Sequence, residues 1–292
     1  MEPLDFQKPA LTEIVARARA YFAFHKGPYR KMVIQPRWPT ILVAPTGVGK
    51  TTTAKMVASD PAVRASILRI AAPSYIPCGA HNRGARETIS VIAEHVALNH
   101  RTLLVIDELD KISDQENPWQ GYIRNEWFDQ LGGTFPTGLT LPDLDDGPNL
   151  TIDELNEKLR TTVFFLGIGT FQEWFDSERT RRTIGFGGAD QVKDEITADI
   201  IAQKLPRELV NRFGKIVRMP ELQEKDYRQI AQEAEGKLPE AMREIFREEV
   251  SQRIQEAIEA KKGVRFIEEA LTAVLINLPE PAPSKYLTLD DL

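Results

Sequence analysis

One stretch of eight residues, 44–51, constrains the fold of this chain more than any other part of its sequence. It reads Ala-Pro-Thr-Gly-Val-Gly-Lys-Thr, follows a short apolar run and precedes a helical stretch over 50–59. Glycines let backbone N–H groups face phosphate oxygens, and the N-terminus of the following helix adds the positive end of its dipole. The stretch therefore predicts a phosphate-binding loop between a strand and a helix, although Ala44 stands where the pattern usually has Gly.

Lys50 and Thr51 are expected to carry the chemistry of this loop. Lys50 would reach the β- and γ-phosphates of ATP, and the Thr51 hydroxyl would bind Mg²⁺. ATP and Mg²⁺ are therefore the predicted cofactors. The other residues predicted to contact the nucleotide are Pro45, Thr46, Gly47, Val48, Gly49 and Thr52.

Short apolar runs alternate with helical stretches through the first two thirds of the chain. The runs are 41–44, 67–70, 103–106, 163–168 and 216–219, and the helical stretches between them are 50–59, 85–98, 117–131 and 171–180. Continuously apolar runs of this length are typical of strands buried on both faces of a parallel sheet. We predict an α/β fold, a P-loop NTPase with a doubly wound parallel five-stranded sheet.

Two domains are predicted. Residues 1–219 would form the large nucleotide-binding domain, interrupted by a turn-rich, acidic stretch over 132–161. Thr151 and Glu154 have the spacing of a capping box for a short helix there, but we interpret the stretch as an insertion outside the core. Residues 220–292 would form a small helical lid domain. Its longest predicted helix carries apolar residues at a spacing of four, namely Met242, Phe246, Val250 and Ile254.

A second motif, Leu-Leu-Val-Ile-Asp-Glu over residues 103–108, places two carboxylates at the end of a buried strand. Open α/β sheets bind ligands at the carboxyl ends of their strands. Asp107 is expected to hold Mg²⁺ through water, together with the Thr51 hydroxyl. Glu108 is expected to orient and deprotonate the attacking water.

Composition excludes some classes of protein. The net charge of −6 argues against a generally basic nucleic-acid coat. The single cysteine, Cys78, excludes an internal disulfide and fits a reducing cytosol. No stretch approaches the roughly 18 apolar residues of a membrane span, so a cytoplasmic protein without a membrane segment is expected.

The stretch Ile-Asp-Glu-Leu-Asp-Lys-Ile over residues 106–112 resembles the AAA+ ATPases of the Clp unfoldase group, in particular their ClpX subgroup. The similarity extends through most of residues 11–278. It implies a ring-forming motor, a homohexamer, that remodels or unfolds a protein client.

The resemblance also implies roles for three further residues. Thr170 lies in the stretch 165–171, which resembles the sensor-1 strand that reads the γ-phosphate. Arg212 lies in the stretch 205–213, which is similar to the one that carries the arginine finger. Arg265 follows Gly263 and Val264 in what resembles the sensor-2 motif at the start of a lid helix.

The chain departs from that family at several places. The Val-Ile-Gly-Gln-like box that contacts adenine is not visible before the predicted helix over 11–25, and Cys78 alone cannot form the zinc module. The aromatic grip of the central pore loop is missing from His81–Gly84. Tyr75 and Ile76 are the nearest apolar pair, and we interpret them first as an anchor of the loop.

Two other functions remain open on the sequence. One is a nucleic-acid-acting AAA+ ATPase, such as a loader, transposition regulator or translocase, with His81, Arg83 and Arg86 in a basic pore loop. The other is a nucleotide-dependent assembly switch. The tripeptide Ile184-Gly185-Phe186 resembles the one that unfoldases present to a barrel peptidase, which makes such a peptidase a candidate partner; the alternative is that both apolar side chains pack in the chain's own core.

Overall fold

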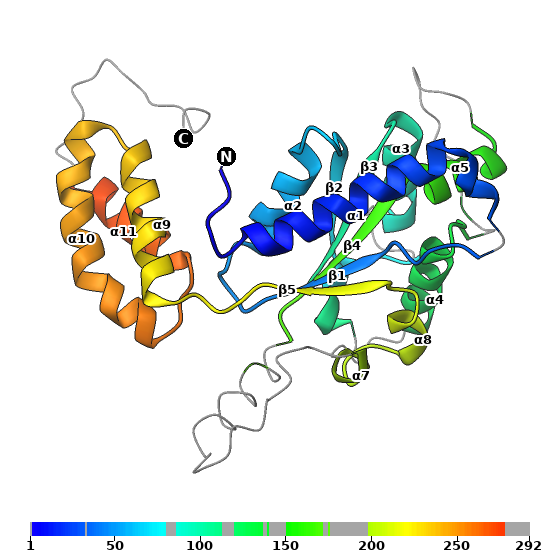
Figure 1. The fold of residues 1–292 in the computed structure, drawn as a ribbon. Helices are drawn as coiled ribbons and strands as arrows, with labels where there is room; N and C mark the ends of the chain where they lie inside the picture. The colour runs from blue at the N-terminus through cyan, green and yellow to red at the C-terminus, as the bar shows by residue number, and fades with distance from the viewer. Residues whose placement is uncertain are drawn as a thin grey trace, which may run out of the picture. The chain divides into compact units, whose positions relative to one another are not determined.

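The structure is a computed structural model, and it describes residues 2–32, 34–79, 86–112, 120–136, 139, 150–171, 175 and 198–277. The chain divides into two compact units (Figure 1). The first holds residues 9–45 and 50–219. The second holds residues 2–8, 46–49 and 220–292, so the middle of the phosphate-loop stretch groups with the C-terminal helices.

A five-stranded sheet forms the centre of the first unit. Its strands are β1 (Thr40–Val43), β2 (Ser66–Ala71), β3 (Thr102–Asp107), β4 (Val163–Gly169) and β5 (Lys215–Arg218). Their order is β2-β3-β4-β1-β5, and every pairing is parallel. The predicted α/β fold with a parallel five-stranded sheet is confirmed.

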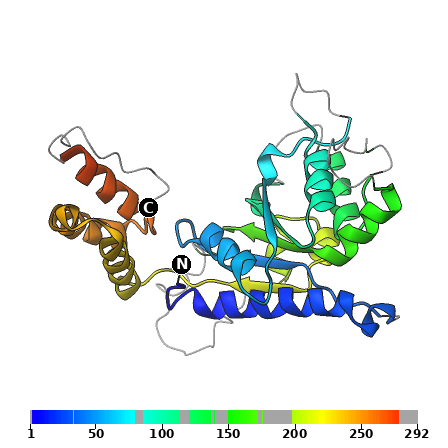
Figure 2. The ribbon, with the colours of Figure 1, turned by 90° about the horizontal axis from the view of Figure 1, so that it is seen from above.

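Helices cover both faces of this sheet. The helix α2 (Lys50–Ser59) connects β1 to β2, whereas α3 (Thr88–Leu98) and α5 (Ile152–Thr162) lie in connections that run back across the sheet in the opposite direction. Because such crossovers are right-handed, a reversal of direction moves the helix to the other face. Figure 2 shows α3 and α5 on the face opposite α1 (Lys8–Lys26).

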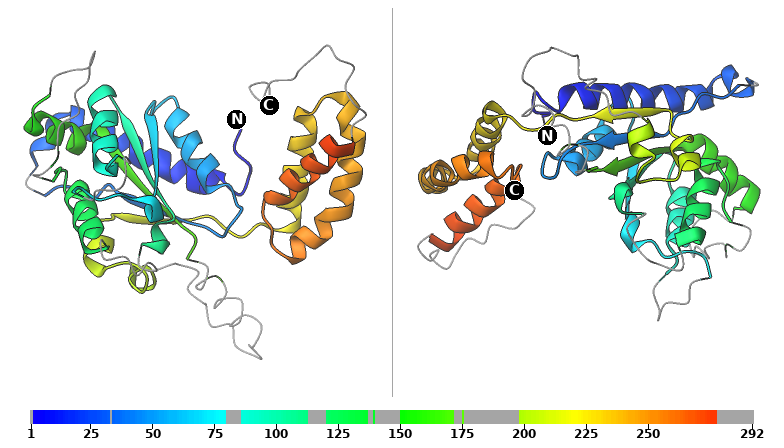
Figure 3. Two further views of the ribbon diagram at one scale, coloured as in Figure 1. Left: turned by 180° about the vertical axis from the view of Figure 1, so that it is seen from behind. Right: turned by 90° about the horizontal axis from the view of Figure 1, so that it is seen from below.

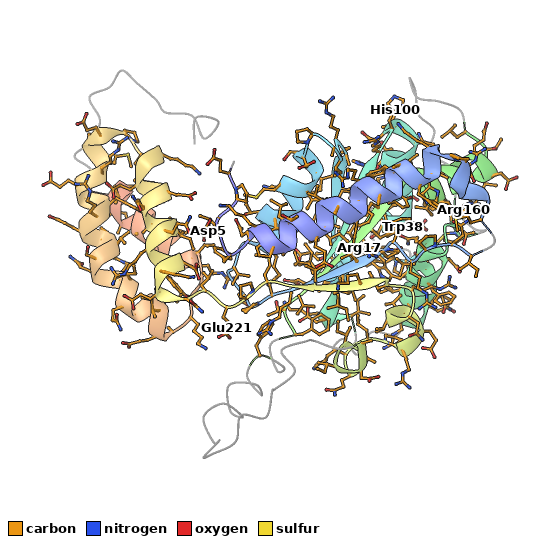
Figure 4. All side chains as sticks on the ribbon, in the orientation of Figure 1. Asp5, Arg17, Trp38, His100, Arg160 and Glu221 are labelled. Atoms are coloured by element: carbon orange, nitrogen blue, oxygen red, sulfur yellow. The ribbon has the colours of Figure 1, made fainter. Side chains whose placement is uncertain are left out.

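The N-terminal helix α1 fixes the segment that leads into β1. Arg17 Nη2 donates to the carbonyl oxygens of Arg37 and Trp38 at 2.7 and 3.3 Å, and Arg17 Nε donates to Thr40 Oγ1 at 3.0 Å. Arg17 and Trp38 are labelled in Figure 4. One side chain thus ties α1 to the strand that ends in the phosphate-loop stretch.

The interpretation of residues 132–161 as an insertion outside the core is wrong for its last part. The capping box of Thr151 and Glu154 is present and starts α5. Leu155 and Leu159 of this helix are each only 1% exposed and pack in the same core as β3 and β4. The turn residues before the helix concealed its amphipathic pattern, and residues 137–138 and 140–149 lie outside the described residues.

The remaining elements of the first unit are five short helical segments and α4 (Gln120–Leu131), whose Ile123 and Trp127 are buried in the core. The short segments are η1 (Pro28–Lys31), η2 (Ala72–Ser74), η3 (Leu109–Lys111), α7 (Ala198–Ile201) and α8 (Arg207–Val210). The helix predicted over 171–180 falls almost entirely outside the described residues.

Three helices make up the C-terminal part of the second unit. They are α9 (Glu224–Lys237), α10 (Glu240–Glu259) and α11 (Arg265–Asn277), and Figure 3 shows them side by side. Met242, Phe246 and Val250 of α10 are buried, as their spacing of four requires for a helix with one apolar face. None of the helices in the described ranges has the length and apolarity needed to cross a membrane.

Candidate nucleotide site

The phosphate-loop stretch runs from the end of β1 to the start of α2, as its sequence predicts. Lys50 is the first residue of α2, and its Nζ donates to the carbonyl oxygens of Ala44 and Pro45 at 2.9 and 2.8 Å. The same Nζ lies 3.3 Å from Thr170 Oγ1. The structure therefore brings together two of the residues predicted to contact the phosphates, although they are far apart in the sequence.

Two glycines meet within the second unit. The Val264 N–H donates to the Gly47 carbonyl oxygen at 2.7 Å. Gly47 and Gly263 both have positive φ values, +76° and +66°, which favour glycine. A Cβ on Gly263 would lie 2.4 Å from the Gly47 oxygen, so no larger residue fits there. Arg265 follows this contact directly and begins α11.

The two carboxylates of the acidic motif lie at the carboxyl end of β3, and both have a cationic partner. Asp107 is buried, and its Oδ2 accepts from Arg69 Nη2 and Nε at 2.6 and 2.8 Å. Glu108 is more exposed and lies 3.2 Å from Lys111 Nζ. Glu108 has a φ of +56°, which is uncommon for a residue with a side chain and turns the chain away from the strand direction.

A third carboxylate, Asp110, positions the residue predicted as sensor 1. Its two oxygens accept hydrogen bonds from the backbone N–H groups of Thr170 and Phe171 at 3.1 and 3.2 Å. Phe171 has a φ of +47°, so the turn after β4 is held in an uncommon conformation. Asp110 thereby links the turn after β3 to the turn after β4.

Thr51 and Asp107 carry the kinds of oxygen that would bind a Mg²⁺ ion together with a nucleotide. Hydroxyl and carboxylate oxygens are the protein ligands that Mg²⁺ prefers, and it usually completes its shell with water and substrate phosphates. The buried Asp107 carboxylate already accepts a cation, Arg69, which shows that the position favours positive charge. Within the described ranges, no group of three or more His, Cys, Asp or Glu residues could hold a metal by itself.

Arg212 lies near the amino ends of the strands, whereas the phosphate-loop stretch follows the carboxyl end of β1. Arg212 precedes β5, whose first residue Lys215 pairs with Thr40 at the amino end of β1. Its guanidinium stacks over the Phe128 ring of α4 at 4.0 Å and, among the described residues, forms no ion pair. At about 3.3 Å per residue, β1 alone spans about 13 Å, which is longer than an Arg side chain. Arg212 therefore cannot reach the phosphate loop of its own chain.

The segment after η2 is anchored by a buried polar cluster. Tyr75 is 4% exposed, and its hydroxyl donates to Glu126 Oε2 at 2.8 Å and accepts from Gln130 Nε2 at 2.8 Å. The Cys78 N–H donates to Glu126 Oε1 at 2.6 Å. Burial raises the pKa of Glu126 above its ordinary value, and burial together with the nearby Glu126 charge raises the pKa of Tyr75. Tyr75 thus fastens the segment to α4.

We expect Tyr75→Phe to destabilise the first unit rather than to disturb contact with a client. The change leaves the Oε2 oxygen of Glu126 without its donor, and an unsatisfied buried polar group costs about 1–3 kcal/mol. Urea unfolding at neutral pH measures this loss. Unchanged stability combined with loss of work on a client would assign the hydroxyl a role outside the fold.

Several predicted residues fall outside the described part of the chain. His81 and Arg83 of the pore-loop segment are among them, as are Ile184, Gly185 and Phe186. Arg86 is described, and it forms an ion pair with Glu94 at 2.7 Å.

Sequence reasoning missed three features of this site. The first is Arg69, whose only signal is a charge inside an apolar strand. The second is the positioning role of Asp110. The third is the segment Glu2–Lys8, which groups with residues 46–49 and the C-terminal helices, although no adenine-contacting pattern is visible there.

Comparison with known proteins identifies part of the chain. Residues 40–133, which run from β1 to the end of α4, match the family described as ATPase family associated with various cellular activities (AAA). No curated protein matches the sequence. An AAA ATPase domain is therefore present, and such a domain implies binding and hydrolysis of ATP.

Proposed function

We propose that this chain is a Mg²⁺-dependent AAA+ ATPase that forms a ring, a homohexamer, and uses ATP to remodel or unfold a protein client. The observation that carries the proposal is the separation of Arg212 from the phosphate loop. The carboxyl ends of the strands carry Lys50, Thr170 and the acidic motif. Arg212 lies near the amino ends of the strands. A catalytic site that needs an arginine is then completed only by a second copy of the chain.

Each residue has a defined task in this proposal. The backbone N–H groups of residues 46–49 and the Lys50 ammonium bind the phosphates, with Pro45 and Thr52 flanking them. Glu108 takes a proton from the attacking water. Mg²⁺, held by Thr51 and Asp107, would offset the charge of the phosphate oxygens. Thr170 lies beside Lys50, where its hydroxyl can donate to a terminal phosphate.

Arg265 is proposed to report the nucleotide state to the helical unit. Its neighbour Val264 bonds the Gly47 carbonyl oxygen, so a change in the loop at Gly47 is transmitted to the start of α11. This contact supports a sensor role because Gly47 belongs to the loop that binds the phosphates.

A protein client is favoured over a nucleic acid by the similarity to the Clp unfoldase group and by the net charge of −6. The tripeptide 184–186 remains a candidate contact for a peptidase. A DNA-binding titration at several salt concentrations separates the classes, because phosphate contacts make the logarithm of affinity fall with the logarithm of salt. Salt-dependent DNA binding that stimulates ATP hydrolysis would replace the protein client by a nucleic acid.

We expect Lys50→Ala to weaken nucleotide binding by about tenfold to a hundredfold. A charge-assisted hydrogen bond contributes about 1.5–3 kcal/mol, and about 1.4 kcal/mol corresponds to a factor of ten. Titration with a fluorescent ADP analogue measures the affinity. The control is Lys55→Ala in the same helix, where the exposed side chain leaves binding unchanged. Equal affinities for Lys50→Ala and wild type would remove Lys50 from the phosphate site.

A further inference from the structure

Arg69 is a charged residue in the middle of β2, an edge strand of the sheet. Its neighbours Leu68 and Ile70 pack against the core. Because side chains alternate along a strand, Arg69 lies on the other face. There its side chain is 52% exposed and its guanidinium contacts a carboxylate that is only 8% exposed, that of Asp107.

The parallel register between β2 and β3 creates this contact. Ala71 pairs with Asp107 and Arg69 pairs with Val105, so Arg69 and Asp107 are diagonal neighbours on one face, within reach of a long side chain. Asp107 Oδ2 accepts two hydrogen bonds from Arg69, and Oδ1 accepts one from the Glu108 N–H at 2.9 Å. Both oxygens of the proposed Mg²⁺ ligand therefore have donors within the protein itself.

We propose that Arg69 is a positioning residue that competes with Mg²⁺ for Asp107 and thereby sets the affinity of the site for the metal. The inference rests on the proposed Mg²⁺-ATP site. In the metal-free protein Arg69 compensates the buried charge of Asp107 and holds its carboxylate in one orientation. A divalent ion that approaches the same carboxylate is repelled by the guanidinium, so the charge of the nucleotide phosphates is needed to bring the metal in.

The direct test measures metal binding rather than turnover. Mn²⁺ serves as the probe, because the free ion is quantified by electron paramagnetic resonance, and it is titrated into protein saturated with ADP. We expect Arg69→Met to bind Mn²⁺ on the order of tenfold more tightly, since one fixed positive charge beside the ligand is removed. Arg69→Gln, which keeps a neutral donor, is expected to change in the same direction.

Arg64→Met is the matched control. Arg64 is exposed and precedes the amino end of β2, whereas Asp107 lies at the carboxyl end of β3. The variant therefore loses the same charge far from Asp107. Its Mn²⁺ affinity is expected to equal that of the wild type.

Thermal unfolding supplies a second readout. Arg69→Met leaves a buried carboxylate without its partner, so the melting temperature of the variant in EDTA is expected to fall below that of the wild type. Addition of Mg²⁺ and ADP is expected to raise the melting temperature of the variant by more than that of the wild type. Unchanged or weaker Mn²⁺ binding in both variants, with ADP binding intact, would overturn the competition. A wild type that binds neither ADP nor Mn²⁺ would overturn the proposed function and this inference together.

Discussion

Glu108→Gln is expected to lower ATP turnover by a factor on the order of 10²–10⁴, the range that a positioned general base contributes. The amide is close in size to the carboxylate but cannot accept the proton of the attacking water. The hydrogen bonds of Lys50 to Ala44, Pro45 and Thr170 are untouched, so nucleotide affinity should remain that of the wild type. Release of phosphate measured at saturating Mg²⁺-ATP gives the turnover.

Glu108 also forms an ion pair with Lys111, so a structural effect has to be separated from a catalytic one. Both side chains are about half exposed, and exposed pairs contribute little to stability. We therefore expect the melting temperature of Glu108→Gln to match that of the wild type. Turnover equal to the wild type would remove Glu108 from the catalytic role.

Arg212→Ala is expected to lower turnover by a factor on the order of 10³–10⁵, the contribution of an arginine finger in related NTPases. The Arg212 guanidinium stacks on Phe128 near the amino ends of the strands, away from the phosphate loop of the same chain. The loss must therefore arise at the site of a neighbouring copy. Turnover per subunit of the wild type should also rise with protein concentration as copies assemble.

Mixing two inactive variants tests this directly. A subunit with Arg212→Ala keeps Glu108, and a neighbour with Glu108→Gln keeps Arg212, so a mixed assembly contains sites with both residues. We expect the mixture to regain a fraction of wild-type turnover, whereas the double variant mixed with either single variant should regain none, because such a mixture contains no site with both residues. A wild type that is fully active as a monomer would contradict the proposal.

The fold follows closely from the sequence because each strand is a continuous apolar run. The five predicted strands lie within one residue of the observed ones, and the helix over 50–59 has the predicted bounds. The phosphate loop is equally predictable from the sequence, since Gly, Lys and Thr stand at fixed spacing. Residues 132–161 are less predictable. Leu155 and Leu159 belong to a core helix, but they follow a turn-rich stretch that favours a loop.

The contacts that complete the site depend on pairings that local sequence does not specify. Arg69 meets Asp107 through the register of two parallel strands, and Asp110 meets Thr170 through the adjacency of β3 and β4. The position of Tyr75 in the sequence indicates an anchor, but its partners, Glu126 and Gln130, are evident only in the structure. Charge and spacing alone could not provide them.

The strand order has a consequence for how the chain acquires its fold during synthesis. The first strand, β1, pairs only with β4 and β5, the last two strands of the sheet. At about 5–20 residues per second, the ribosome needs roughly 6–25 s after β1 emerges before β4 follows, and β1 has no partner in that interval. The segment that carries the phosphate loop therefore depends on pairing with distant parts of the chain, and pairing over such separations in sequence is expected to slow folding.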